Sequence, residues 1–284
     1  MNLGVAAAIA SMVSWGIGDF LIQRSARSLG DWKTLFYIGL IGNAGLLPFC
    51  YKGLSSLGAG DLLVLVAIGA FSAFAAVIDF EALKKGKLAI VEPIFCLEIP
   101  VAALLAFFML GERISFLQMA LVAGLVVSLV LVSLSKLEFV HRKMLLERGV
   151  RLTVLAAISM GVLNFAFGVG AREVSPILAT FVIHSIAAIV SLFVLVARRQ
   201  FWPGRILSEA RQAFPMAIAD TVAWASFAYA LTKTPIAIAT AFSESYIVIA
   251  VLLGIFVNRE RLKRYQYVGI FGSIVCGIFL ATTL

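Results

Sequence analysis

Four ionisable side chains stand near the middle of long apolar stretches, where a charge is costly. They are Glu98, His184, Asp220 and Glu244. A charged group at the centre of a bilayer costs roughly 2.5–3.5 kcal/mol on insertion scales, so it is expected to face protein, water or a ligand. These four groups are therefore the first candidates for the chemistry of this chain.

The three acids have no Lys or Arg at a comparable depth in their stretches. Burial without a cation favours the neutral carboxyl, which can then exchange a proton for another proton or for a cationic solute. The alternative is that a protonated acid bonds to a facing helix and only holds the helices together. His184 is likewise either a proton relay or a packing residue.

Polar and aromatic side chains accompany these groups. Glu244 lies in "AFSESYIVI", which also contains Tyr246, and Asn164 is a polar residue in another apolar stretch. Trp15 and Trp224 could stack on an organic solute or hold a cation over a ring, or they could pack in the core. The predicted contacts to substrate or protons are Glu98, Asp220, Glu244, His184, Tyr246, Trp15, Trp224 and Asn164. No catalytic residue and no metal ligand is assigned.

The elements that must position these residues are membrane-spanning helices. Apolar residues make up 62% of the 284 positions, against about 45–50% in soluble domains. A spanning helix needs about 20 mostly apolar residues, and backbone in lipid must bond within its own helix. The sequence predicts an all-α membrane protein with ten such helices, near residues 3–22, 34–51, 61–82, 88–108, 115–134, 152–170, 175–196, 212–231, 235–256 and 264–283.

The chain repeats itself. Shifted by 148 positions, "ALKKGKLAIVEPIFCLEIPVAALLAFFMLGER" lies over "ALTKTPIAIATAFSESYIVIAVLLGIFVNRER" without a gap. We therefore divide the chain into two five-helix repeats, residues 1–135 and 150–284, joined by a loop at 136–149. Because five is odd, the second repeat is expected to enter the membrane from the opposite side, as in many carriers with a central cavity.

The basic residues predict an orientation. Counted with the helix ends beside them, the odd-numbered connections hold 19 of the 23 Lys and Arg, and the even-numbered ones hold 4. Basic residues mark the cytoplasmic side. We therefore expect a multi-pass protein of the cell membrane whose two termini face outward.

Glycine, proline and charge at helix ends suggest packing roles. Pro93 and Pro100 predict a kink in the fourth helix, either static or able to bend. Close helix contacts are expected at Gly39, Gly42, Gly45, Gly269 and Gly272. The pairs Glu112–Arg113 and Glu260–Arg261 are expected to fix the turns into the fifth and tenth helices.

Several segments resemble a known family. "SWGIG", "ALKKGKLAIVEPI", "LGERISFLQMALVAG" and "NRERLKRYQYVGIFG" are similar to the EamA family of the drug/metabolite transporter superfamily. The resemblance covers nearly the whole chain and implies a secondary transporter with a cavity between its two halves. Members of that family commonly keep their termini in the cytoplasm, so the outward termini expected from the charge count are a departure.

The sequence thus favours a secondary active transporter that moves a small organic solute by alternating access, with protons as a candidate coupling ion. The solute could be a metabolite, an amino acid-like compound or a cationic, drug-like compound. The base-poor interior favours cations, zwitterions or protons over anions. The alternative is a membrane-embedded enzyme, but the chain lacks GxSxG, HExxH and P-loop motifs. No cofactor and no nucleic acid is expected, and the protein would sit in the lipid bilayer as a monomer or a homodimer.

Overall fold

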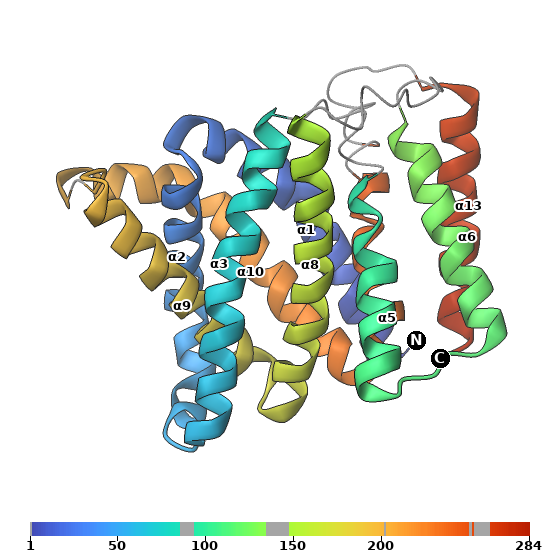
Figure 1. Ribbon diagram of the computed structural model, residues 1–284, viewed down its shortest axis with the longest axis horizontal. Helices are drawn as coiled ribbons and strands as arrows, with labels where there is room; N and C mark the ends of the chain where they lie inside the picture. Colours follow the sequence, from blue (N-terminus) through green and yellow to red (C-terminus); the bar gives the residue numbers. More distant parts are fainter. Residues whose placement is uncertain (1, 86–93, 135–147, 202, 250–251, 253–261) are drawn as a thin grey trace.

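The computed structural model describes residues 2–85, 94–134, 148–201, 203–249, 252 and 262–284. Glu92, Pro93, the Glu260–Arg261 pair and most of the predicted loop at 136–149 lie outside these residues. The described residues form a bundle of helices (Figure 1). Its elements are α1 (Leu3–Leu29), α2 (Asp31–Leu54), α3 (Ala59–Lys85), α5 (Glu98–Leu110), α6 (Phe116–Ser133), α8 (Arg148–Glu173), α9 (Pro176–Ala197), the 3-10 helix η1 (Pro203–Arg205), α10 (Ile206–Lys233), α11 (Ile236–Glu244) and α13 (Arg264–Thr282).

Eight of these helices are long and apolar enough to cross a membrane, and they match eight of the ten predicted spans. The remaining two predicted spans, 88–108 and 235–256, contain shorter apolar helices in the described part of the chain. The all-α membrane class is therefore confirmed, and these two spans are where the structure differs from the sequence-based expectation.

Both shorter helices meet a break in the middle of the predicted span. Cys96 and Leu97 form a turn directly before α5, and Pro100 lies in the first turn of α5, where its missing N–H removes no helical hydrogen bond. The proline thus lies at a helix start and not in a kink. Ser245 forms the turn after α11, because its N–H bonds three residues back to the Phe242 carbonyl (3.1 Å).

Local signals in the sequence account for several other helix ends. The Asn2 side chain accepts the Gly4 N–H (2.9 Å) and caps α1. Gly30 connects α1 to α2 with φ of 89°, and Gly111 ends α5 with φ of 66°, conformations that glycine adopts without strain. Ser115 and Gln118 bond reciprocally at the start of α6.

The largest helix–helix interfaces join the two halves of the chain. They pair α1 with α10, α2 with α9, α3 with α8 and α6 with α13. The α2–α9 pair is antiparallel, because Gly39 faces Ala188 while Gly53 faces Leu178. Both chain ends lie at the same end of the bundle (Figure 1), where the Asn2 side chain donates to the Leu284 carbonyl (3.4 Å).

The pair of α6 and α13 lies at one edge of the bundle (Figure 1) and packs through small residues. Gly124 lies against Cys276, and Gly272 lies against Ser128. Gly124 and Gly272 are 148 positions apart in the sequence, and so are Ser128 and Cys276. The repeated sequence therefore makes the same close contact twice.

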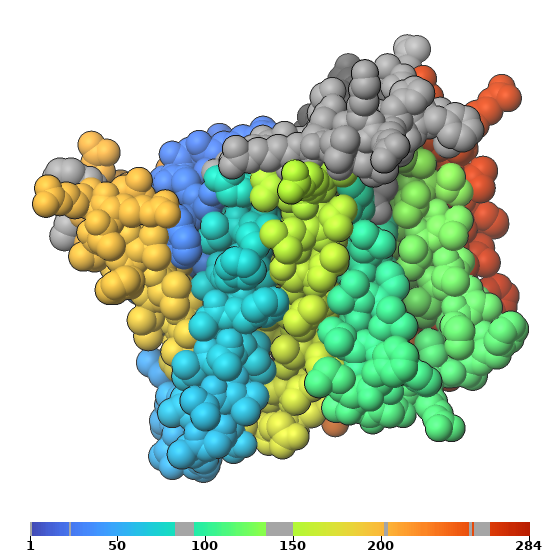
Figure 2. Space-filling model, in the orientation of Figure 1, coloured from blue at the N-terminus to red at the C-terminus, as the bar shows by residue number. Residues whose placement is uncertain are grey.

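Apolar side chains cover the outside as well as the core. Figure 2 shows one face, on which α3, α8, α5 and α6 follow one another. Large exposed apolar groups on these helices include Leu63, Phe74, Phe108 and Leu155. An apolar exterior of this kind fits contact with lipid rather than with water.

We expect Gly269→Ala to destabilise the α6–α13 pair. An added Cβ at this position would lie 2.6 Å from the Ser128 carbonyl oxygen, which is backbone and cannot rotate away. Overpacking of this kind costs about 1–3 kcal/mol. The measurement is the thermal unfolding midpoint of the purified protein in detergent, which should fall.

Gly45→Ala is the matched control. Gly45 was expected at a close helix contact, but among the described residues nothing beyond its chain neighbours and its own helix backbone lies within 4 Å of its added Cβ. Alanine also favours helix over glycine, so this variant should unfold at the same temperature or higher. Equal unfolding temperatures for the two variants would contradict the proposed packing at Gly269.

Candidate functional site

One cavity lies between the two halves. Its volume open to water-sized spheres is about 90 Å³, which is room for several water molecules. Its wall is built by Trp15, Asp19, Ile22, Leu35, Ile38, Ser72, Ala76, Asp79, Phe80, Glu98, Met160, Leu163, Asn164, His184, Ala187, Asp220, Trp224, Glu244 and Tyr246. All eight residues predicted from the sequence are in this wall, so the structure brings them together. Their role in binding stays a prediction.

The cavity lies nearer one end of the bundle. It is lined by the middle and later parts of α1 and α3 and by the first turns of α2. That end is the one where α1 and α3 end and where α2 and α10 begin. The first connection, from α1 to α2, and the seventh, from α9 to α10, belong to this end.

Five carboxyl groups face the cavity, each from a different helix. They are contributed by α1, α3, α5, α10 and α11, and the wall contains no Lys or Arg among the residues that the structure describes. Glu98 lies within electrostatic range of Glu244, Asp79 and Asp19, and Asp220 within range of Asp19. Like charges at short range repel strongly where water is scarce, so the site favours the arrival of positive charge.

The carboxyl groups have polar neighbours from other parts of the chain. The Asn164 side chain on α8 donates to Glu98 (Nδ2 to Oε2, 3.2 Å). The Tyr246 hydroxyl donates to Asp19, which links the segment after α11 to α1. These contacts hold two of the acids in place with neutral donors.

His184 and Asp220 differ in their bonding. The Trp224 side chain, one turn further along α10, is a hydrogen-bond donor to Asp220. His184 on α9 is 5% exposed, and its Nδ1 has no hydrogen-bond partner among the described residues. The His184 and Trp224 rings are 6.3 Å apart and perpendicular. An unpaired buried ring nitrogen is available to a bound solute.

An aromatic cluster adjoins the acids. Trp15 and Trp224 meet edge to face with ring centroids 5.1 Å apart, and Phe227 packs on Trp15 at 5.3 Å. Phe167 packs on Trp224 at 4.8 Å. Of these four, only the two tryptophans line the cavity. The cavity thus has an aromatic floor beside an acidic wall.

Asp19 and Asp79 were missed as site residues because the sequence placed them near helix ends. In the structure α1 continues to Leu29 and α3 to Lys85, so both acids lie inside their helices. Their helical spacing relative to other cavity residues could have identified them. Asp19 follows Trp15 by four positions, and Asp79 follows Ser72 by seven, so each shares a face with another cavity residue.

Glu98 and Glu244 lie at the ends of the two short helices, α5 and α11, where the chain is interrupted. Glu98 is the first residue of α5, and Glu244 is the last residue of α11. Leu97, in the turn before α5, lies 148 positions before Ser245, in the turn after α11, so the chain breaks at equivalent places in both repeats. Discontinuous helices near the membrane centre commonly surround the substrate of a carrier.

No group of three or more His, Cys, Asp or Glu in the described part of the chain could hold a metal ion.

The comparisons with known proteins agree with this architecture. The model of the EamA-like transporter family matches residues 2–134 and 147–283. A solved crystal structure is similar with a TM-score of 0.77 and 14% identity over 99% of this chain and 96% of the other, which shows a shared fold. No curated protein matches. Since the family match covers nearly the whole sequence in two copies, the chain is a membrane protein that belongs to the EamA-like transporter family.

Proposed function

We propose that this protein is a secondary active transporter that moves small, positively charged organic solutes across the cell membrane by alternating access, in exchange for protons. The observation that carries the proposal is the cavity itself. Five carboxyl groups and a histidine face it from within a membrane bundle, and the described part of its wall holds no side chain of Lys or Arg.

Two antiparallel repeats are the architecture we infer. If the second repeat is inverted, equivalent helices that pair with each other must run in opposite directions. The α2–α9 pair does so, and so does α6–α13, where Gln118 near the start of α6 bonds to the Thr283 carbonyl after the end of α13 (3.3 Å). These contacts support inversion, which gives carriers their two alternating states.

Ten crossings follow if the two broken spans are counted. Chain ends that lie side by side require an even number of crossings, and the bond between Asn2 and the Leu284 carbonyl brings the two ends together. Eight long helices satisfy that condition, and so do ten when α5 and α11 belong to the fourth and ninth crossings. Ten also gives each repeat an odd number, which inversion requires.

The charge of the cavity defines the class of solute. A phosphate or carboxylate solute would need a cationic partner to replace its lost hydration, and the described residues of the wall include no Lys or Arg. A protonated amine or quaternary ammonium finds carboxylates on several sides. It also finds the faces of Trp15 and Trp224, which attract cations by about 0.5–2 kcal/mol.

Proton exchange follows from the same groups. Without a bound cation, several acids in one cavity are most stable when some are protonated. A cation that enters ionises these groups and releases protons. The titratable groups that face the cavity are Asp19, Asp79, Glu98, His184, Asp220, Glu244 and Tyr246. Coupling then arises because the cavity holds either protons or solute.

The orientation that we propose makes this the inward-facing state. The cavity lies toward the end of the odd-numbered connections, which are rich in Lys and Arg. Because basic residues mark the cytoplasm, the cavity is closer to that side and both termini face outward.

Glu98→Gln, Asp220→Asn and Glu244→Gln should each weaken transport of an organic cation. Each change removes a charge-assisted contact of about 1.5–3 kcal/mol, which corresponds to about tenfold or more in affinity. The measurement is uptake into reconstituted vesicles of a radiolabelled panel of organic cations, zwitterionic amino acids and carboxylate anions.

Glu173→Gln is the matched control, because it removes one acid on the exposed surface outside the cavity. It should leave uptake unchanged. Unaltered cation uptake in all three cavity variants, or a preference of the unmodified protein for anions, would exclude the proposed site.

Solute and protons should move in opposite directions. When an organic cation is added outside vesicles loaded with a pH-sensitive dye, protons leave as the cation enters, and the lumen should become alkaline. An imposed gradient with an acidic lumen should accelerate uptake. Glu98→Gln should reduce the pH signal together with uptake. Uptake that neither changes the lumenal pH nor responds to the gradient would show transport without proton exchange.

A further inference from the structure

An ion pair and three hydrogen bonds join four helix ends at one point. The Arg172 guanidinium pairs with Glu112 (Nη1 to Oε1, 2.5 Å), and Glu112 also accepts the Ile236 backbone N–H at the start of α11 (2.8 Å). Arg172 donates further to the carbonyls of Leu231 (2.8 Å) and Thr234 (3.2 Å) at the end of α10. We call this set of contacts the Glu112 node. Glu112 was expected to fix the turn after α5, but its partners are on α8 and α11.

The node lies at the end of the bundle away from the cavity. It joins the ends of α5, α8 and α10, and the first residues of α1 pack beside it, since Gly4 lies against Thr234. None of its residues lines the cavity. The two side chains are 18% and 29% exposed, so the pair is shielded enough to be stronger than an open surface pair.

The aromatic cluster lies between the node and the cavity. Phe167 and Phe227 are fully buried and pack on Trp15 and Trp224, which form the cavity floor. On α1, Ser11 lies between Gly4, which is beside the node, and Trp15, which is at the cavity floor. Ser11 is 0% exposed. A solute in the cavity is therefore separated from this end by packed side chains.

The node also fixes α11, which carries Glu244. Glu112 satisfies the first backbone N–H of α11, and its negative charge is favourable at the positive end of a helix. This helix has nine residues, so its capped end and Glu244 are only a few turns apart. Displacing the start of α11 would therefore move a cavity acid.

We propose that Glu112 and Arg172 are positioning residues that hold this end of the transporter closed while the cavity faces the other end. Opening requires that the ends of α8, α10 and α11 separate, and the node joins these three ends. The inference rests on the proposed alternating access. Its test is a labelling experiment that needs no transported solute, so the two can fail separately.

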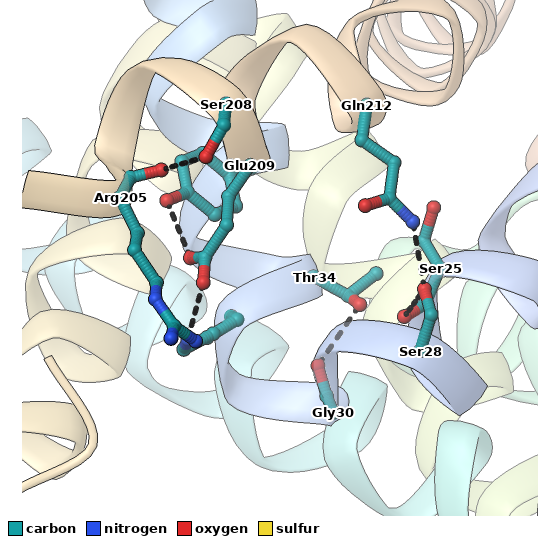
Figure 3. A network of polar contacts seen from close by, with 10 residues as sticks. Ser25, Ser28, Gly30, Thr34, Arg205, Ser208, Glu209 and Gln212 are labelled. Atoms are coloured by element: carbon teal, nitrogen blue, oxygen red, sulfur yellow. Dashed lines mark hydrogen bonds and ion pairs between the residues drawn. The ribbon is translucent and has the colours of Figure 1, made fainter. Parts of the chain in front are cut away.

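The opposite end has a comparable ion pair that serves as a control. Lys33 on α2 pairs with Glu209 on α10 (2.7 Å), and Tyr37 donates to the other oxygen of Glu209 (2.8 Å). Figure 3 shows the surrounding contacts, in which Gln212 donates to Ser28 (3.0 Å) and Thr34 to the Gly30 carbonyl (2.9 Å). Glu209 is 14% exposed, similar to Glu112.

The experiment measures how fast a thiol reagent reaches two positions. The natural cysteines are first replaced (Cys50→Ala, Cys96→Ala, Cys276→Ala). Ser11→Cys then reports on the closed end, and Ala76→Cys reports on the cavity. Each is combined with Glu112→Gln, which keeps the shape of the side chain but loses its charge, and with Glu209→Gln as the control. Labelling with N-ethylmaleimide is followed in detergent after each variant is shown to be monodisperse.

Glu112→Gln should raise the rate at Ser11→Cys by about tenfold and lower the rate at Ala76→Cys, because opening one end closes the other. Glu209→Gln should not raise the rate at Ser11→Cys. Glu112→Asp, which keeps the charge, should restore much of the protection. Equal rates with and without the Glu112 charge would overturn the proposal. So would a rise at Ser11→Cys with no fall at Ala76→Cys, because that result shows local loosening only.

Discussion

The structure depends on one electrostatic constraint: several carboxyl groups share a cavity inside a membrane bundle, and the described wall of this cavity includes no Lys or Arg. Each acid comes from a different helix, so the repulsion among them acts between the helices that line the cavity. Protons or a cationic solute relieve that repulsion, and either one would draw the helices together around the site. Binding and packing are therefore governed by the same charges, which is a physical basis for coupling occupancy to conformation.

A second constraint is that backbone in a membrane must be bonded unless it lines a cavity. The chain breaks at 96–97 and at Ser245, and the adjacent Glu98 and Glu244 face the cavity. At the distant end of α11, Glu112 satisfies the Ile236 N–H. Helix α11 is thus held at one end by the Glu112–Arg172 ion pair, and its other end faces the cavity. This arrangement suits α11 to transmit movement between the ion pair and the cavity.

Much of this arrangement could be predicted from the sequence, because the length of apolar stretches and the acids within them are local signals. They gave the eight long helices and the eight cavity residues that the structure brings together, although the role of these residues stays a prediction. Asp19 and Asp79 were not predicted as site residues, because a charged group near a helix end can ordinarily reach water. Only the observed lengths of α1 and α3 place them inside their helices.

The breaks beside Glu98 and Glu244 were not predicted either, because apolar composition does not distinguish one continuous helix from two shorter ones. The Arg172–Glu112 contact joins residues 60 positions apart, a separation at which sequence pattern says nothing about partners.

The repeated sequence gives the two ends similar backbones, but side chains make the ends unequal. Asp19 and Asp79, which face the cavity, correspond after 148 positions to Phe167 and Phe227, which are buried in the aromatic cluster. One end of the same scaffold therefore carries acids that need water, protons or cations, and the other carries rings that exclude them. An inverted pair of identical repeats would favour neither state. On the proposed mechanism, the exchange of two acids for two phenylalanines, together with the Glu112 node, favours the state whose cavity lies toward one end.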